Sequence, residues 1–318
     1  MKQKSAKKAA YAALYIMLAL FALILAISPE IYVPVCLAAI KMWAECVLPA
    51  LFPFMVITLI MIKSGVADAV SYPLVGVAKK LNLPPAAPAL FVMSAFSGYP
   101  AGSRILGEYC RTNNMVSDAK KLAPLCSTSG PLFIIGSVGQ NMFGDKLAGF
   151  YIFIAHIASV AIISLILCAK SSPSTARIMP SNGAKSNLLY DCFYSAVISV
   201  IVAGGFICFF YTFSAAAENY NLLLFAQAPL SLIVGENTSS AFCKGLIEAT
   251  GGCYALAQSG EKFAIPLAGF LITFGGVSIL CQQLCYLRPL GVSALKFAAV
   301  KAAQALLCFL LLLPAAFI

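Results

Sequence analysis

The stretch SAFSGYPAGSR, Ser94 to Arg104, decides how this chain folds. It lies in a run of 23 uncharged residues, Leu81 to Ser103, whose hydropathy is typical of a segment at membrane depth. Gly98, Pro100 and Gly102 fall at alternate positions in the middle of that run. Proline lacks an amide donor and glycine loses more backbone entropy on folding than other residues, so the pattern disfavours a continuous spanning helix.

Interrupted backbone inside a bilayer is tolerated only where protein or a water-filled cavity satisfies its polar groups. We therefore predict a re-entrant hairpin over residues 86–111, in which two half-helices meet at Gly98–Gly102 and the break faces a cavity. The alternative is one kinked transmembrane helix whose glycines allow close packing.

The composition identifies the class of protein. Of the 318 residues, 61% are hydrophobic and 10% are charged, whereas roughly 25% of an average soluble domain is charged. The net charge of +10 comes from lysines and arginines that separate apolar runs, as the positive-inside bias predicts, so nucleic acid is not an expected partner. The twelve cysteines are scattered and His156 is the only histidine, so we expect no metal site.

The first apolar runs predict two crossings of the membrane. Residues 1–30 carry lysines before an apolar run, which predicts an uncleaved first transmembrane helix with a cytoplasmic N-terminus. Residues 31–48 mix charged and apolar side chains, which favours an amphipathic helix at the interface. A second spanning helix is expected over residues 46–63.

The positions of the basic residues then test the hairpin. If residues 86–111 are re-entrant, the basic clusters at 63–80 and 111–121 and the polar linker 170–187 all lie on the cytoplasmic side. If residues 86–111 cross the membrane fully, the basic cluster at 111–121 and the linker 170–187 become external. The rule for loop charges therefore favours the hairpin.

The second half of the chain repeats this order. The linker 170–187 separates a first repeat, 31–169, from a second, 188–318. In the second repeat, Gly275 and Gly276 interrupt the uncharged run 263–287, which we predict to be the second hairpin and the counterpart of the first. The sequence thus predicts an all-α polytopic membrane protein with two inverted repeats, each with a re-entrant helical hairpin.

Four motifs in this order carry a family resemblance: GYPAGSRILGEYC (from Gly98), CSTSGPLFIIGSVG (from Cys126), GLIEATGG (from Gly245) and FGGVSILCQQ (from Phe274). The chain resembles the YlbJ-like sporulation integral membrane proteins, which contain paired nucleoside-recognition (Gate) domains, and it is more distantly similar to concentrative nucleoside transporters. The resemblance covers about residues 30–315. It implies a scaffold with substrate between two hairpin tips, and a role in moving dipicolinate across the outer forespore membrane if the organism sporulates.

Polar residues and glycines near the chain breaks are the candidate substrate-binding residues, because half-helix N-termini and exposed amides attract anions and hydrogen-bond acceptors. They are Ser97, Gly98, Tyr99, Ser103, Arg104, Ser127, Thr128, Ser129, Glu248, Thr250, Gly275, Gly276, Ser278 and Gln282.

Three of the charged or titratable residues have two interpretations each. Arg104 is expected to clamp an anion, or to extend to the cytoplasmic interface. Glu248 is a candidate for substrate hydroxyls or a coupling ion, or it pairs with Lys244. His156 is a candidate proton relay, or a packed neutral histidine.

The function we predict is secondary transport or facilitated passage of a small polar or anionic solute across a bacterial membrane. A nucleoside transporter and a non-transporting Gate-type scaffold are the alternatives. A hydrolase is not expected, because the chain lacks GxSxG, HExxH and paired intramembrane aspartates. The expected partners are a small-molecule substrate and the lipid bilayer; no cofactor is expected, and a coupling ion (H+ or Na+) and a homo-oligomer stay open.

Overall fold

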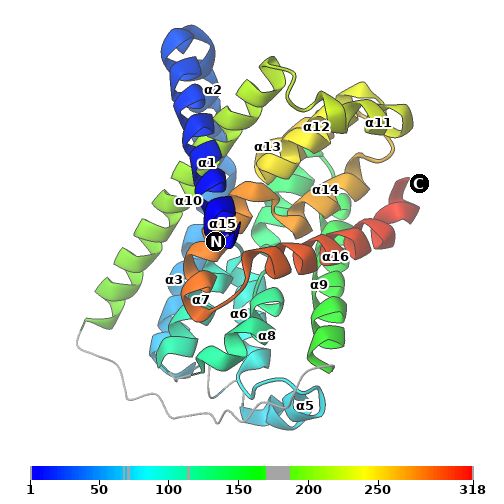
Figure 1. Cartoon of the computed structure of the whole chain (residues 1–318). Coiled ribbons are helices and arrows are strands. Elements are labelled where there is room, and N and C mark those ends of the chain that lie inside the picture. Colours follow the sequence, from blue (N-terminus) through cyan, green and yellow to red (C-terminus); the bar gives the residue numbers. More distant parts are fainter. Residues whose placement is uncertain (1, 67–68, 70–71, 113–114, 170–186, 317–318) are drawn as a thin grey trace.

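A computed structural model describes residues 2–66, 69, 72–112, 115–169 and 187–316. Helices make up nearly all of this part of the chain, and it contains no strand. Most of the linker predicted at 170–187 lies outside the described residues. The all-α architecture expected from the sequence is confirmed (Figure 1).

The N-terminal region forms two long helices. Helix α1 covers Lys2–Ile27 and packs against the rest of the protein near its C-terminal end, through Phe21. One continuous helix then covers Pro29–Lys63; its parts are α2 (Pro29–Met42), a π-helical turn (Trp43–Val47) and α3 (Leu48–Lys63).

The interfacial helix predicted over residues 31–48 is therefore not present. Its two charged residues, Lys41 and Glu45, instead form an exposed ion pair with an N–O distance of 3.9 Å on the surface of the long helix. Because these residues are four apart, both fall on one helix face, and the other faces are free to pack.

Helix α10 (Leu188–Asn219) runs beside the whole of this long helix and packs against both α2 and α3. At 1.5 Å per residue the two helices are each about 50 Å long, which exceeds the roughly 30 Å of a bilayer core. Gly204 of α10 lies against the indole of Trp43, where a Cβ would be 2.7 Å from the ring. The close contact fixes the two helices side by side.

The first half of the chain contains the predicted hairpin helices. A 3-10 turn (Tyr72–Leu74) and α5 (Val75–Lys80) precede α6 (Ala87–Ser97) and α7 (Ala101–Thr112). Helices α6 and α7 form hairpin 1. They pack against each other, and a Cβ on Gly102 would overlap the Ser94 hydroxyl. Since residues eight apart would be about 12 Å apart in one helix, the chain reverses at Gly98, whose φ of 70° favours glycine.

An interrupted helix follows hairpin 1. It consists of α8 (Ala119–Leu125), a non-helical segment at 127–130, which we call the first break, and a π-helix at Leu132–Met142. Helix α9 (Lys146–Ala169) then completes the first half.

The second half has its hairpin in a place the sequence did not predict. Helix α10 leads through α11 (Leu224–Val234) to α12 (Glu236–Ile247) and α13 (Ala249–Ser259). Helices α12 and α13 fold back on each other and form hairpin 2. A Cβ on Gly245 would lie 3.1 Å from the Cα of Gly252.

The hairpin predicted over residues 263–287 is an interrupted helix instead. Helix α14 (Ala264–Phe274) and α15 (Gly276–Leu287) are joined at Gly275, which we call the second break. The two helices belong to a single apolar segment, Ala264–Leu290. They hardly touch each other: α14 packs on α9 and α16, whereas α15 packs on α7 and α10. Helix α16 (Ala294–Leu312) follows, and a 3-10 turn (Leu313–Ala316) ends the described chain.

Both halves therefore share one order of elements: long helix, hairpin, interrupted helix, helix. The break at Gly98 corresponds to the turn at Glu248, and not to Gly275 as the sequence predicted. Figure 1 shows α6, α7 and α8 toward one end of the molecule and α11, α12 and α13 toward the other. This arrangement is the one expected of inverted repeats, whose symmetry axis stays a prediction.

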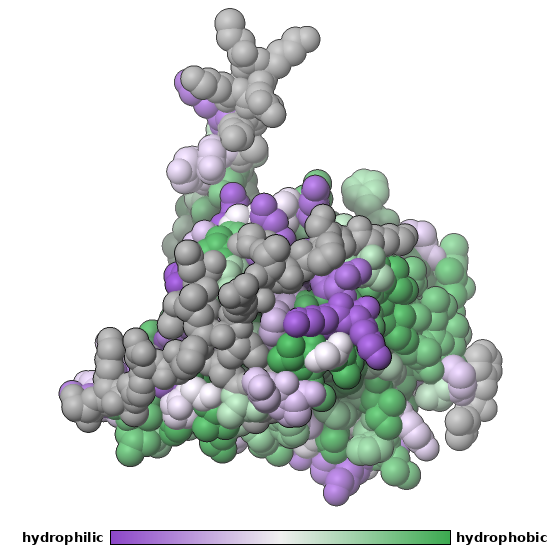
Figure 2. All heavy atoms as spheres, turned by 90° about the horizontal axis from the view of Figure 1, so that it is seen from below, coloured by the Kyte–Doolittle hydropathy of each residue, from purple (hydrophilic) through white to green (hydrophobic). Residues whose placement is uncertain are grey.

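Five helical stretches of the described chain are long and apolar enough to cross a membrane. They are Pro29–Lys63, Lys146–Ala169, Leu188–Asn219, Ala264–Leu290 and Ala294–Ala316. Seen from the end that carries α5, hydrophilic side chains gather near the middle of the face, and apolar side chains lie around them (Figure 2). The apolar surface fits a protein surrounded by lipid.

Candidate functional site

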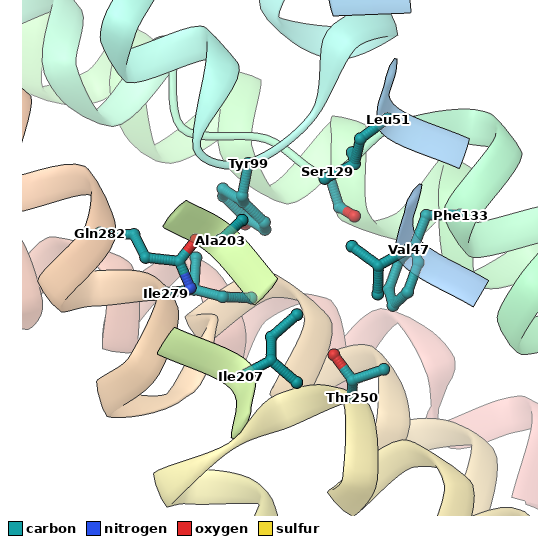
Figure 3. Close-up of a pocket in the computed structure, with 10 residues that line it drawn as sticks. All are labelled: Val47, Leu51, Tyr99, Ser129, Phe133, Ala203, Ile207, Thr250, Ile279 and Gln282. Carbon is teal, nitrogen blue, oxygen red and sulfur yellow. The ribbon is translucent and has the colours of Figure 1, made fainter. Parts of the chain in front are cut away.

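A small cavity lies where the hairpin tips and the helix breaks meet. Four of its lining residues are polar or aromatic residues predicted from the sequence: Tyr99, Ser129, Thr250 and Gln282. They come from hairpin 1, the first break, hairpin 2 and the helix after the second break (Figure 3). The remaining wall is apolar and consists of Val47, Leu51, Phe133, Ala203, Ile207 and Ile279.

The volume of this central cavity is about 30 Å³. One water needs roughly 10–15 Å³ of such space, so the cavity has room for about two water molecules. A solute of several heavy atoms does not fit unless the hairpins separate. The structure thus represents a closed arrangement of the site.

Tyr99 connects hairpin 1 to the second break. Its side chain is buried, and its hydroxyl donates to the carbonyl oxygens of Ile272 and Thr273 at 3.1 and 3.2 Å. These carbonyls lie in the last turn of α14, where the interruption at Gly275 leaves them without intrahelical partners. The tyrosine therefore satisfies backbone that the break exposes.

The three hydroxyl residues of the first break each have a different buried partner. The hydroxyl of Thr128 bonds to that of Ser94 in α6 at 2.9 Å, and the hydroxyl of Ser127 donates to the Gln283 side chain. The backbone N–H of Ser129 donates to Nε2 of His156 at 2.9 Å. Because Nε2 accepts, the proton of the neutral ring is on Nδ1, which bonds to the Thr273 hydroxyl at 2.9 Å.

The second break combines two glycines with two glutamines. Gly275 and Gly276 have φ values of 91° and 62°, and a Cβ on Gly276 would be 2.9 Å from the carbonyl oxygen of Gly245 in hairpin 2. Only glycine adopts these angles without strain at such close contact. Next to them, Gln282 donates to Ser278 at 3.3 Å, and Gln283 accepts from Ser103 at 3.1 Å.

Two other predicted residues have structural roles at hairpin 1. The hydroxyl of Ser97 donates to the Met93 carbonyl within its own helix. Gly98 lies against the first break, where a Cβ would be 2.8 Å from the Gly130 nitrogen. Both residues shape the turn and do not line the cavity.

Arg104 does not line the central cavity. Its Nη1 donates to the Ser195 carbonyl at 2.6 Å and to the Ser199 hydroxyl, both in α10. The guanidinium thus ties hairpin 1 to α10 through Nη1, and the anion clamp stays a prediction.

Glu248 and Lys244 do not pair with each other, contrary to one of our two interpretations. The Glu248 carboxylate accepts from the backbone N–H groups of Thr250 and Gly251 at 3.0 and 2.7 Å, which makes it the N-cap of α13. Lys244 instead pairs with Glu218 of α10 at 2.9 Å. Since a carboxylate already occupies the N-terminus of α13, that terminus does not offer its amides to a bound anion.

A second cavity, of about 180 Å³, lies on the other side of the hairpin 2 tip. Its lining includes Glu218, Lys244 and Glu248, together with Tyr211 and Tyr254. Thr250 borders the central cavity, whereas Gly251 and Gly252 border this one. The tip of hairpin 2 therefore separates the two cavities.

Sequence reasoning missed Lys301 of α16 as a site residue. Its side chain is fully buried, and its Nζ donates to the Tyr99 hydroxyl at 3.0 Å and to the Ser127 carbonyl at 2.8 Å. In the sequence it is a lysine close to the start of a helix, a position from which lysines usually reach the interface. One feature pointed to its burial. At a rise of 1.5 Å per residue, Lys301 lies about 10 Å along the helix from the start of α16.

Within the described part of the chain, no group of three or more metal-ligating side chains is close enough to hold a metal ion. The site consists of hydroxyl, amide, imidazole and ammonium groups at the meeting point of four chain interruptions. Such a set can hydrogen-bond a small polar solute.

Comparison with known proteins gives one informative similarity. The chain is 24% identical, over 276 residues, to the sporulation integral membrane protein YlbJ of Bacillus subtilis (strain 168). The match covers 76% of this chain and 67% of that protein. No family model and no solved structure matches the chain, so the paired Gate domains implied by the resemblance stay a prediction. The similarity and the apolar helices together support the resemblance described above: the chain is a multi-pass integral membrane protein similar to the sporulation protein YlbJ.

Proposed function

We propose that this protein is a secondary transporter, or a facilitator, of a small polar or anionic solute across a bacterial membrane. The observation that carries the proposal is the central cavity, because two hairpin tips and two helix breaks from different parts of the chain contribute Tyr99, Ser129, Thr250 and Gln282 to it. A scaffold that recruits other proteins has no use for such convergence. Discontinuous helices that meet near the membrane midplane are typical of secondary transporters.

The closed state of the cavity fits alternating access. The cavity has room for only about two water molecules, so the solute enters only when one hairpin moves. Hairpin 1 and hairpin 2 lie toward opposite ends of the molecule in Figure 1. This arrangement supports the proposal that each hairpin gates one side.

Dipicolinate is the substrate we propose to test first. The resemblance to YlbJ-like proteins implies it, and the membrane would then be the outer forespore membrane if the organism sporulates. Uridine tests the nucleoside alternative.

The experiment uses the purified protein in liposomes with labelled dipicolinate inside or outside. We expect flux above that of protein-free liposomes, and roughly a 5- to 10-fold loss in Gln282→Ala, because one hydrogen bond to the solute is removed. Gln140→Ala, at an exposed position that does not line the cavity, is the matched control and retains flux. Absence of flux for both solutes, or equal flux in Gln282→Ala and the wild type, contradicts the proposal.

A further inference from the structure

Lys301 is a buried cation whose described partners are all uncharged. Its Nζ donates to the hydroxyl of Tyr99 and to the carbonyl of Ser127, and it lies 5.1 Å from the centre of the Tyr99 ring. The ion pairs among the described residues are Lys41–Glu45, Asp118–Lys121 and Glu218–Lys244, and none includes Lys301. A buried ammonium group without a counter-ion is unfavourable, so an anion bound beside it would stabilise it.

A second observation points to the same kind of missing group. The side-chain nitrogen of Gln283 is buried and has no hydrogen-bond partner in the described structure, although the oxygen of the same amide accepts from Ser103 and Ser127. One of the three N–H donors of Lys301 is likewise without a described partner. Ser127 contacts both side chains, so the unused donors lie around one residue.

This excess of donors lies directly behind the wall of the central cavity. Tyr99 forms part of that wall and at the same time bonds to Lys301. A displacement of the Tyr99 hydroxyl, when hairpin 1 moves, exposes the ammonium group to the cavity. A carboxylate supplies both the negative charge and the acceptors that these donors lack.

We propose that Lys301 is the specificity-determining residue of the site, and that its ammonium group pairs with a carboxylate of the solute in place of the Tyr99 hydroxyl. The inference rests on the proposed transport function. It assigns to Lys301 the role that the sequence suggested for Arg104, whose Nη1 bonds to α10.

The test compares two ligands of the same shape. One is dipicolinate (pyridine-2,6-dicarboxylate), and the other is the uncharged pyridine-2,6-dicarboxamide. Binding is measured on the purified full-length protein in detergent, from the shift in Tm with ligand concentration. We expect the wild type to bind the acid about 10- to 100-fold more tightly than the amide, as a charge-assisted pair implies. In Lys301→Gln that ratio should fall to about 1, and in Lys301→Arg it should be retained.

Lys296→Gln is the matched control, because it removes the same charge from an exposed position of the same helix and should keep the ratio. If Lys301→Gln does not give a folded protein, Lys301→Met, which retains the aliphatic stem, replaces it. An unchanged preference for the acid in a folded Lys301 variant overturns the inference. So does a wild type that binds acid and amide equally.

The two proposals fail separately. Flux of uncharged solutes in liposomes, with no acid preference in the binding assay, refutes the role of Lys301 and leaves transport intact. Acid-selective binding that depends on Lys301 without any flux refutes transport and supports the carboxylate site.

Discussion

At the scale of the residue, glycine decides how closely the interrupted segments approach each other. Gly102 of α7 is the sharpest case, since a Cβ there would overlap the Ser94 hydroxyl and the Cys126 carbonyl oxygen. The Ser94 hydroxyl is held by Thr128. Neither neighbour is the free end of a flexible side chain, so an added methyl group forces hairpin 1 and the first break apart.

We therefore expect Gly102→Ala to destabilise the protein by about 1–3 kcal/mol, the usual effect of overpacking a tight site. The measurement is Tm in detergent, followed by size-exclusion chromatography. Gly205→Ala is the control: Gly205 lies within helix α10 and a Cβ there meets nothing within 4 Å. It should be neutral or stabilising by up to about 1 kcal/mol, and equal effects in the two variants would refute the packing argument.

His156 also acts at this scale, as a bridge between the two breaks. It accepts from the Ser129 N–H of the first break and bonds to Thr273 just before the second. These two partners favour the packed, neutral interpretation of His156.

His156→Phe keeps the size of the ring and removes both hydrogen bonds. The Ser129 N–H and the Thr273 hydroxyl then stay buried without that partner, at about 1–3 kcal/mol for each group left unpaired. A clear fall in Tm is expected. A Tm equal to that of the wild type would mean that the bridge contributes nothing to stability.

At the scale of the element, hairpin 2 is held to α10 by a polar tether. One oxygen of Glu218 accepts from the Ser240 hydroxyl at 2.6 Å, and the other pairs with Lys244 at 2.9 Å. The side chains of Lys244 and Glu218 are 29% and 38% exposed, so the ion pair contributes less than about 1 kcal/mol. A weak tether of this kind suits a segment that must move.

Glu218→Gln should leave Tm nearly unchanged and yet release hairpin 2. We expect amide hydrogen exchange over residues 236–259 to become about 2- to 5-fold faster, since less than about 1 kcal/mol of local stability is lost. Lys41→Gln breaks another exposed ion pair and serves as the control. Exchange that stays as slow as in the wild type, or that rises equally in both variants, would show that the tether does not hold the hairpin.

At the scale of the whole molecule, the ends of the two hairpins lie toward opposite ends of the protein (Figure 1). Lys79 and Lys80 lie in the last turn of α5, and Arg111 lies in the last turn of α7. Figure 1 shows α5 toward the end of the molecule where α9 finishes and α10 begins. The loop-charge rule predicts that this end is cytoplasmic.

Single cysteines at exposed positions test this topology in a background without the twelve native cysteines. Lys80→Cys and Arg111→Cys flank hairpin 1, and Lys262→Cys follows hairpin 2. We expect an impermeant thiol reagent to label positions 80 and 111 from the cytoplasmic side only, and position 262 from the opposite side only. Labelling of 80 and 111 from different sides would mean that residues 86–111 cross the membrane.

The sequence by itself determined the class of the protein and two of the places where its helices break. Low charge and long apolar runs require helices in a membrane, because lipid offers no partners for exposed backbone. Gly98 and Gly275 interrupt helices through their own φ angles, a local property that a glycine in an apolar run reveals. For the same reason Tyr99, Ser129, Thr250 and Gln282 could be predicted near breaks or turns, and all four line the central cavity; their role in binding a substrate stays a prediction.

Only the tertiary structure decided what each break does and which charge is buried. Whether a chain reverses or continues at a break depends on the surfaces that receive its two arms: α15 packs on α7 and α10, so the helix continues past Gly275. The true turn of hairpin 2 has Glu248 at φ −133° and ψ 108°, stabilised by the amides that follow it, with no proline at the turn to mark it. The burial of Lys301 depends on Tyr99 and Ser127, which are distant in sequence, and a helical pattern does not encode contacts of that range.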